Sequence, residues 1–274
     1  MELLKNTLFI NLEQRPDRLE HALSEFNKMG ISAERINGVK LQKGAIGCTM
    51  SHIKCLELAK SRNYDHVFIC EDDITFTNPE LFKRNLAQFY ANNDIMWDLL
   101  IVGGNIVPPY QTIGEYCARV LQCQTTTGYI VKREYYDTLI SNFKESVHNL
   151  IKHPDNTREF ALDIYWKRLQ LQDFWYMIIP ATVTQYESYS DIEERTVNYD
   201  HLMLDMEKTW FFEMKKKQQE QIDEMNKQLE LQRIHNQKTN VTSTQSNITH
   251  ESTTPYLLQS HKKTGDAGLS MKFY

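Results

Sequence analysis

The stretch Val67-Phe68-Ile69-Cys70-Glu71-Asp72-Asp73 decides how this chain of 274 residues is interpreted, because four apolar residues run directly into three acids. A run this short and this apolar is typical of a strand that is buried on both faces. In open α/β sheets, ligands bind outside the carboxyl ends of such strands. Adjacent carboxylates repel one another unless cations offset them, and oxygen ligands suit magnesium or manganese. The stretch therefore predicts a metal site that holds a phosphorylated ligand.

Segments with strand character alternate with segments of helical spacing on both sides of this stretch. Five further strands are expected, at residues 7–12, 31–36, 99–102, 127–131 and 175–179. Helices are expected at residues 16–29, 49–61, 79–90, 135–143 and 162–171. Such alternation predicts the α/β fold class, a sandwich with a mainly parallel central sheet.

Glycines are expected to separate several of these elements. Gly30 ends the first helix, because the apolar periodicity stops there. A loop marked by Gly38, Gly44 and Gly47 is expected before the second helix, and Gly103 is expected to end the fourth strand.

The composition changes near residue 207, which predicts three parts: a main domain at 1–206, a polar helical extension at 207–236 and a disordered tail at 237–274. Ile222, Met225 and Leu229 follow heptad spacing in the extension, so this segment is a candidate for self-association. The tail contains two glycosylation sequons, at Asn240 and Asn247, which are expected to be unused.

Charge and cysteine content narrow the function classes. The formal net charge of −5 argues against a nucleic-acid partner. No apolar run of membrane-spanning length and no signal peptide is visible, so no transmembrane segment is expected. Five cysteines, an odd number without a CxxC pair, are expected to be reduced thiols, which predicts a cytoplasmic location.

The three acids admit more than one interpretation. Glu71-Asp72-Asp73 fits the acid-x-acid pattern with which nucleotide-sugar glycosyltransferases hold a divalent cation at a departing diphosphate. The same residues, read on to Thr75, approach the Asp-x-Asp-x-Thr pattern of haloacid-dehalogenase-type phosphatases. There the first acid is the nucleophile, and the longer side chain of Glu71 would misplace the attacking oxygen. A short acidic turn can also simply cap the next helix.

Other polar residues follow predicted element ends. Asn11, Arg15 and Arg18 follow the first strand, where groups that meet a nucleotide or a phosphate would lie, although the arginines can equally be solvated. Ser51 and His52 are candidates for ligand contact or for helix capping.

Asp163 lies among apolar and aromatic residues near a predicted helix start. Desolvation there would raise its pKa, which suits a general base, whereas an acid at a helix start also interacts favourably with the helix dipole.

Taken in order, several segments resemble glycosyltransferase family 25, which includes bacterial lipooligosaccharide galactosyltransferases and animal procollagen galactosyltransferases. The series covers residues 8–193, about two-thirds of the chain. The matching segments are Ile10-Asn11-Leu12 with Arg15, Asp17 and Arg18; residues 44–48 with Ser51 and His52; residues 67–73; residues 126–130; Leu162-Asp163; and Gln185 with Ser190-Asp191-Ile192.

The resemblance implies a GT-A fold, a Rossmann-like sandwich, and inverting transfer of galactose or a related hexose from a UDP-sugar to a glycan or hydroxylysine-type acceptor. It implies manganese, or magnesium, at Asp73 with help from Asp72, and Asp163 as catalytic base. The donor-binding residues that it implies are Asn11, Arg15, Arg18, Ser51, His52, Glu71, Asp72 and Gly128.

The chain departs from the family pattern in one segment. Lys54-Cys55-Leu56 stands where an aromatic residue usually follows the Ser-His pair, which leaves packing around donor or acceptor open. A second class of function is a non-catalytic adaptor, with a vestigial transferase domain and a tail that recruits partners.

Overall fold

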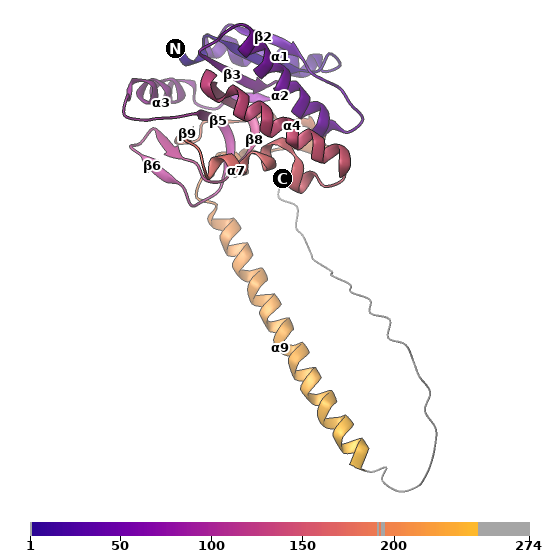
Figure 1. Cartoon of the computed structure of the whole chain (residues 1–274). Coiled ribbons are helices and arrows are strands. Elements are labelled where there is room, and N and C mark those ends of the chain that lie inside the picture. Colours follow the sequence, from indigo (N-terminus) through magenta and orange to yellow (C-terminus); the bar gives the residue numbers. More distant parts are fainter. Residues whose placement is uncertain (1, 191, 193–194, 246–274) are drawn as a thin grey trace. The chain divides into compact units, whose positions relative to one another are not determined.

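The computed structural model describes residues 2–190, 192 and 195–245. The chain divides into two units, residues 1–208 and residues 209–274. The first unit contains all the sheets, and the second contains one long helix (Figure 1).

An eight-stranded sheet forms the centre of the first unit, in the order β2-β1-β3-β8-β5-β9-β7-β6. Its strands are β1 (Thr7–Asn11), β2 (Ala33–Asn37), β3 (His66–Glu71), β5 (Leu99–Ile106), β6 (Gln111–Ile113), β7 (Cys117–Arg119), β8 (Cys123–Lys132) and β9 (Trp175–Ile178). The pairings place β8 and β7 antiparallel to the other six strands. The predicted α/β fold with a mainly parallel central sheet is confirmed, and the two antiparallel strands make the sheet mixed.

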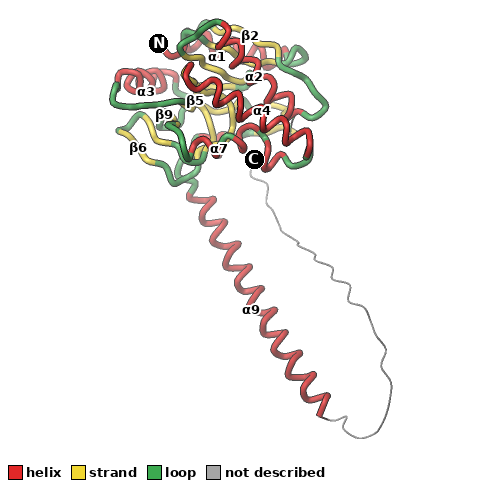
Figure 2. Tube along the Cα trace, in the orientation of Figure 1, coloured by secondary structure: helices red, strands yellow, loops and turns green. Residues whose placement is uncertain are grey.

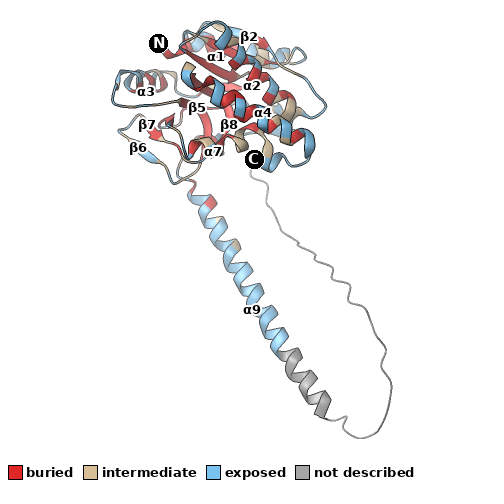
Figure 3. Cartoon of the chain, in the orientation of Figure 1, coloured by how far each residue is buried: buried red, intermediate tan, exposed pale blue. Residues whose placement is uncertain are grey.

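Four helices cover the two faces of this sheet: α1 (Pro16–Met29), α2 (Gly44–Ser61), α3 (Pro79–Ala91) and α4 (Tyr136–Lys152). Successive strand residues point to opposite faces, so Val67 and Ile69 pack in a core with α2 and α4, whereas Phe68 and Cys70 pack in a second core with α1 and α3. Figures 1 and 2 show α2 beside α4 over one face. Residues His66 to Cys70 of β3 are buried, as the apolar run predicts. Figure 3 shows the labelled central strands β5 and β8 as buried too.

The first unit also contains two small sheets of two strands each. One pairs β4 (Ile74–Phe76) with β10 (Val183–Gln185), and the other pairs β11 (Ser188–Ser190) with β12 (Arg195–Val197). The short helices of this unit are η1 (Glu2–Leu4), η2 (Arg133–Tyr135), α5 (Thr157–Phe160), α6 (Leu162–Tyr165), α7 (Lys167–Gln170) and α8 (Asp200–Met203).

Three expected boundaries are wrong. Gly44 and Gly47 lie inside α2, not in a loop before it. Gly47 serves close packing and not a turn, because a side chain there would collide with the backbone oxygen of Val39. Gly103 does not end β5, which continues to Ile106 with irregular pairing to β8. The helix expected at 162–171 is divided into α6 and α7 at Trp166, which is fully buried.

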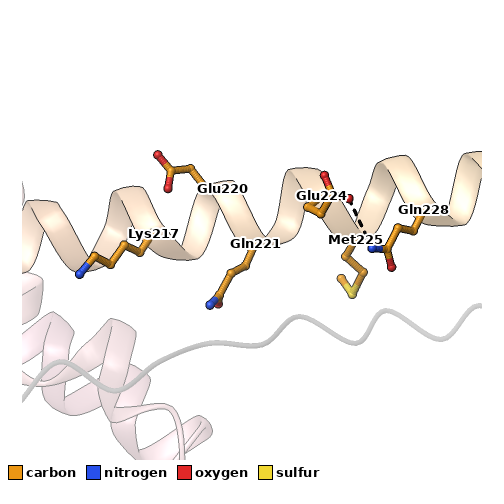
Figure 4. Close-up of a pocket in the computed structure, with 6 residues that line it drawn as sticks. All are labelled: Lys217, Glu220, Gln221, Glu224, Met225 and Gln228. Carbon is orange, nitrogen blue, oxygen red and sulfur yellow. Dashed lines mark hydrogen bonds between the residues drawn. The ribbon is translucent and has the colours of Figure 1, made fainter.

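The second unit consists, in its described part, of α9 (Thr209–Gln245), which continues past residue 236, where a disordered tail was expected to begin. Ile222, Met225 and Leu229 are exposed on it. Figure 4 shows six α9 side chains, among which Gln228 donates a hydrogen bond to Glu224 at 3.3 Å. The sequon at Asn247 lies outside the described residues. No helix in the described ranges has both the length and the apolar character needed to cross a membrane.

Candidate active site

The carboxyl end of β3 brings its acids beside the end of β1. Glu71 is the last residue of β3 and pairs in register with Ile10, the neighbour of Asn11. The side-chain amide of Asn11 donates to Asp72 Oδ2 at 2.7 Å. Asp72 and Asp73 are both buried, so the acids face the protein and not bulk water. Parallel strands that end at one edge produce this juxtaposition, as the sequence predicts.

Arg18, in the first turn of α1, bridges the two aspartates. Its Nη1 donates to Asp72 Oδ1 at 3.1 Å and to Asp73 Oδ2 at 2.9 Å. The second oxygen of Asp73, Oδ1, is buried and accepts no hydrogen bond from any described residue. A buried carboxylate oxygen without a donor is expensive unless a cation completes its shell. The pair therefore fits a hard divalent cation, with Asp73 Oδ1 as the available ligand atom.

Burial also changes the protonation of these acids. It raises the pKa of Asp73 from 3.8 to about 7, against the opposing effect of Arg18 and with help from Glu71 and Asp72. The pKa of Asp72 is raised by the same burial, although Arg18 and Asn11 favour its charged form. Positive charge at this position would therefore stabilise the ionised pair.

The β11–β12 hairpin contacts both arginines that were predicted to bind the donor. Arg18 Nη2 donates to the Ser188 hydroxyl at 2.9 Å and to the Tyr189 carbonyl oxygen at 3.3 Å. Arg15 donates to that same carbonyl at 2.9 Å and pairs with Asp17 at 2.8 Å. Asp191, which belongs to the resemblance, lies outside the described residues.

Glu71 is held from two directions. The Thr126 hydroxyl donates to Glu71 Oε1 at 2.5 Å, and His52 Nε2 lies 3.4 Å from the same oxygen. Burial opposes ionisation of Glu71, but the contacts with His52 and Thr126 outweigh it and lower the pKa of this acid. Glu71 is therefore the acid of this site that is most firmly ionised.

Two residues that were predicted to bind the donor, Ser51 and Gly128, make contacts within the protein. Ser51 donates to the carbonyl of Gly47 and accepts from the Val39 N–H, each at 2.8 Å, so its hydroxyl fastens the preceding loop to α2. Gly128 lies in β8, where an added Cβ would be 3.1 Å from both Ile74 and Phe68. These two residues help to build the walls of the site, and direct contact with a donor stays a prediction.

Asp163, in α6, is oriented by β8. Its Oδ2 accepts a hydrogen bond from the Thr125 backbone N–H at 2.9 Å. Thr125 has φ of 77°, a conformation that is costly for a β-branched residue and is maintained by its surroundings. Burial raises the pKa of Asp163, while the Thr125 N–H and Lys167 favour its charged form.

Adjacent residues of β8 thus connect the two sets of acids. Thr125 binds Asp163, and Thr126 binds Glu71. Burial raises the pKa of the Cys48 thiol well above its ordinary value, and the nearby charges of Glu71, Asp163, Asp73 and Asp72 raise it further. The acids at the end of β3 and the acid of α6 therefore lie close enough to affect one another's charge.

Several residues of this site were not predicted. Cys48 reads as a core thiol in the sequence, although it stands one helical turn before His52, and that i, i+4 spacing is the signal that could have found it. Thr125 and Thr126 gain their roles only from the strand register and the strained φ.

An open-sheet α/β domain with buried acids at a strand's carboxyl end belongs to the class of α/β proteins whose ligands bind at that edge of the sheet. Comparison with known proteins narrows this class. Residues 35–103, which include β3 and its acids, match the family model of "Glycosyltransferase family 25 (LPS biosynthesis protein)".

Three curated relatives also have glycosyltransferase names. A glycosyltransferase 25 family member of Aedes aegypti is 31% identical over 34% of this chain and 20% of its own length. A Haemophilus influenzae protein with the provisional name of glycosyltransferase is 41% identical over 29% of this chain and 27% of its own length. An inactive glycosyltransferase 25 family member 3 of Mus musculus is 26% identical over 38% of this chain and 22% of its own length. The chain spans about a quarter or less of these relatives.

Among solved structures, a glycosyltransferase involved in the glycosylation of the major capsid of PBCV-1 has a TM-score of 0.40 and 9% identity, over 63% of this chain and 80% of that one. The family match and the curated relatives support the assignment of the chain to glycosyltransferase family 25, and so confirm the resemblance drawn from its motifs.

Proposed function

We propose that the chain is a metal-dependent, inverting hexosyltransferase that moves galactose or a related hexose from a UDP-sugar to an acceptor hydroxyl. One observation carries the proposal: Glu71 at the end of β3 and Asp163 of α6 accept hydrogen bonds from the adjacent β8 residues Thr126 and Thr125, so Asp163 lies near the acids at the end of β3. An inverting displacement needs a base and a leaving-group site in line but on different segments, and the placement of Asp163 in α6 and of the metal-binding acids after β3 supports this proposal.

The donor end of the site is formed by Asp72 and Asp73. Asp73 and, with it, Asp72 would hold manganese or magnesium, which when bound would stabilise the negative charge of the departing diphosphate. Arg18 lies against both aspartates and would also face the diphosphate oxygens. Asn11 fixes Asp72 from the neighbouring strand, and Glu71 would accept hydrogen bonds from ribose or donor-sugar hydroxyls.

The acceptor end of the site is formed by Asp163. An acceptor hydroxyl oxygen attacks the anomeric carbon, the bond from that carbon to the diphosphate oxygen breaks, and UDP leaves with the bonding electrons. The hydroxyl proton passes to the carboxylate of Asp163. Burial raises the pKa of Asp163, which suits a base working near neutral pH. The acceptor is a hydroxyl of a glycan or of a hydroxylysine-type protein side chain.

A binding screen tests the donor assignment. UDP-galactose, UDP-glucose, UDP-N-acetylglucosamine and free UDP would be compared by thermal shift with manganese, since a ligand of the folded state raises its apparent stability. A UDP-hexose is expected to raise the melting temperature of the wild type but not of Asp73→Ala. Equal shifts in the two proteins, or none in either, would refute the donor site.

A non-catalytic adaptor is the second candidate, and two observations favour it. One relative from Mus musculus is named inactive, and Arg18 already pairs with both aspartates. An adaptor would lack turnover with every donor and would lose a binding partner when the residues after 208 are removed. A transferase would show turnover that does not depend on those residues.

A further inference from the structure

A second group of metal-binding side chains lies beside the acids, and it has a different chemical character. Cys48 and His52 stand one turn apart on α2, and Glu71 faces them from the end of β3. One ligand atom from each residue lies within 4.8 Å of the other two. The group offers sulfur, nitrogen and oxygen, whereas the pair Asp72 and Asp73 offers oxygen alone.

The histidine of this group has a buried nitrogen without a hydrogen bond. His52 is 0% exposed, and its Nδ1 lies 2.9 Å from the Tyr129 hydroxyl. Its Nε2 faces Glu71 Oε1 at 3.4 Å but makes no hydrogen bond with any described residue. Metal binding would select the tautomer in which Nδ1–H donates to Tyr129 and Nε2 presents a lone pair on the side of Glu71, in place of the tautomer that favours ionised Glu71 through Nε2–H. Such fixing of one ring nitrogen by an outer partner is typical of metal-ligating histidines.

We propose that Cys48, His52 and Glu71 form a zinc site, with the fourth coordination position left for a water molecule. Mixed sulfur, nitrogen and oxygen ligands favour zinc over the harder manganese and magnesium ions. Binding converts the Cys48 thiol to a thiolate and releases its proton to solvent, while His52 stays neutral and Glu71 stays ionised.

The geometry needs little adjustment to bind the ion. Zn–S and Zn–N bonds of about 2.3 and 2.0 Å place tetrahedral ligand atoms roughly 3.5 Å apart. Atoms that now lie within 4.8 Å of one another therefore need to approach by about 1 Å. Thr126 donates to Glu71 and Tyr129 holds His52, so both ligands already have outer partners.

A zinc ion in this group would connect two elements of the fold. Two ligands come from α2 and the third from β3, so zinc would clamp this helix to the strand that carries the acids. His52 and Glu71 are also predicted donor-binding residues, but Asp72 and Asp73 are not ligands of the zinc, so the zinc site can be tested separately from the proposed transferase function.

Cobalt substitution tests the site directly, because a thiolate bound to tetrahedral Co²⁺ gives a near-ultraviolet charge-transfer band. The wild type, Cys55→Ala and Asp73→Asn are expected to bind one Co²⁺ with this band and to exchange it for Zn²⁺. Cys55 is the matched control, since it is a buried cysteine of the same helix outside the group. Cys48→Ala is expected to lose the band, and His52→Gln to bind at least tenfold more weakly, by analogy with the 10- to 100-fold cost of losing outer partners.

Absence of the band in the wild type, or its persistence in Cys48→Ala, would overturn the proposal. X-ray absorption at the zinc edge of the wild-type protein covers the case in which a variant does not fold. One sulfur at about 2.3 Å with nitrogen or oxygen neighbours is expected, and a shell without sulfur would overturn the site. Retention of the band in Asp73→Asn separates this result from the fate of the manganese site.

Discussion

Asp73 destabilises the folded state when it is ionised, which indicates that the residue has a role other than stability. Its carboxyl group is buried, shares one arginine with Asp72, and keeps one oxygen without a hydrogen bond among the described residues. An acid in such a place destabilises the folded state whenever it is ionised. Residues of this kind concentrate at functional sites, where stability is given up for chemistry.

The first prediction concerns the pH dependence of stability. The pKa of Asp73 is about 7 in the folded protein against 3.8 ordinarily, so the folded state binds the proton more tightly. Its relative stability therefore falls as pH rises from about 4 to about 7 and is flat above that. Asp73→Asn removes this loss, so in EDTA the variant should exceed the wild type at pH 8 by at least about 1 kcal/mol.

Urea unfolding at pH 4 and pH 8 measures this difference, with Asp94→Asn as an exposed control. The advantage of Asp73→Asn should be small at pH 4 and absent from the control at both values. A variant that is less stable than the wild type at pH 8 would contradict the account of this residue.

The second prediction concerns Asp163. Asp163→Asn retains an oxygen that can accept from the Thr125 N–H but cannot take a proton from the acceptor. Turnover should fall by about 10²- to 10⁴-fold, the usual contribution of a general base, while the Kd for UDP stays unchanged. Steady-state kinetics and calorimetric titration with UDP check the two quantities. Weaker UDP binding with normal turnover would show that Asp163 has another role.

At the scale of elements, close packing around glycines positions the site. A Cβ at Gly47 would lie 2.3 Å from the backbone oxygen of Val39, so α2 and the loop before it touch directly. At Gly44, in the same helix, an added Cβ meets Ile192 Cγ1 at 3.0 Å, a side-chain atom that can move. The approach at Gly47 fixes the helix that carries Cys48 and His52.

The third prediction follows from this contrast. Gly47→Ala should destabilise the protein by about 1–3 kcal/mol, because a backbone must shift to admit the methyl group. Gly44→Ala should stay within about 1 kcal/mol of the wild type, since alanine also favours the helix. Thermal unfolding of both variants measures the difference. Equal stability of the two would mean that the Val39 loop yields freely.

The sequence predicts those elements whose signal is local. β1, β3 and β9 follow from unbroken apolar runs, and α1 from Pro16 at its start and Gly30 at its end. The start of α2 and the extent of β5 are missed because Gly47 and Gly103 serve close packing, which in a sequence resembles a turn. The antiparallel direction of β8 has no local signal at all, since it depends on which strands neighbour it.

The site divides in the same way. Asp72, Asp73 and Asn11 can be placed together from the sequence, because strand ends meet at one edge of a sheet. Thr125 and Thr126 could not be assigned roles, because their contacts depend on the irregular pairing of β5 with β8. The bridge from Arg18 to both aspartates is likewise a tertiary fact, since the two segments lie 54 and 55 positions apart.

At the scale of the whole molecule, the first unit contains both hydrophobic cores and the whole candidate site. Both hydrophobic cores are built from residues below 208, and so is every candidate site residue. α9 is exposed along its described side chains beyond the first turns. Its apolar residues Ile222, Met225 and Leu229 are exposed, so self-association through them stays a prediction.

The fourth prediction concerns a chain that ends at Lys208. It should unfold at the same temperature as the full chain and retain its turnover, because neither hydrophobic cluster of the first unit and no candidate site residue lies after position 208. Sedimentation should show fewer chains per particle than in the full chain only if residues 207–236 associate. Loss of turnover in a truncated protein that still melts cooperatively would assign α9 a part in catalysis.

The measurement that tests the central claim most directly is UDP release from a UDP-hexose by wild type and Asp73→Asn, each with manganese and with EDTA. The wild type with manganese should release UDP, and either EDTA or the substitution should reduce the rate by at least about 100-fold, comparable to removing one electrostatic stabiliser of a transition state. Undiminished release in EDTA, or in Asp73→Asn, would contradict a cation site at the end of β3.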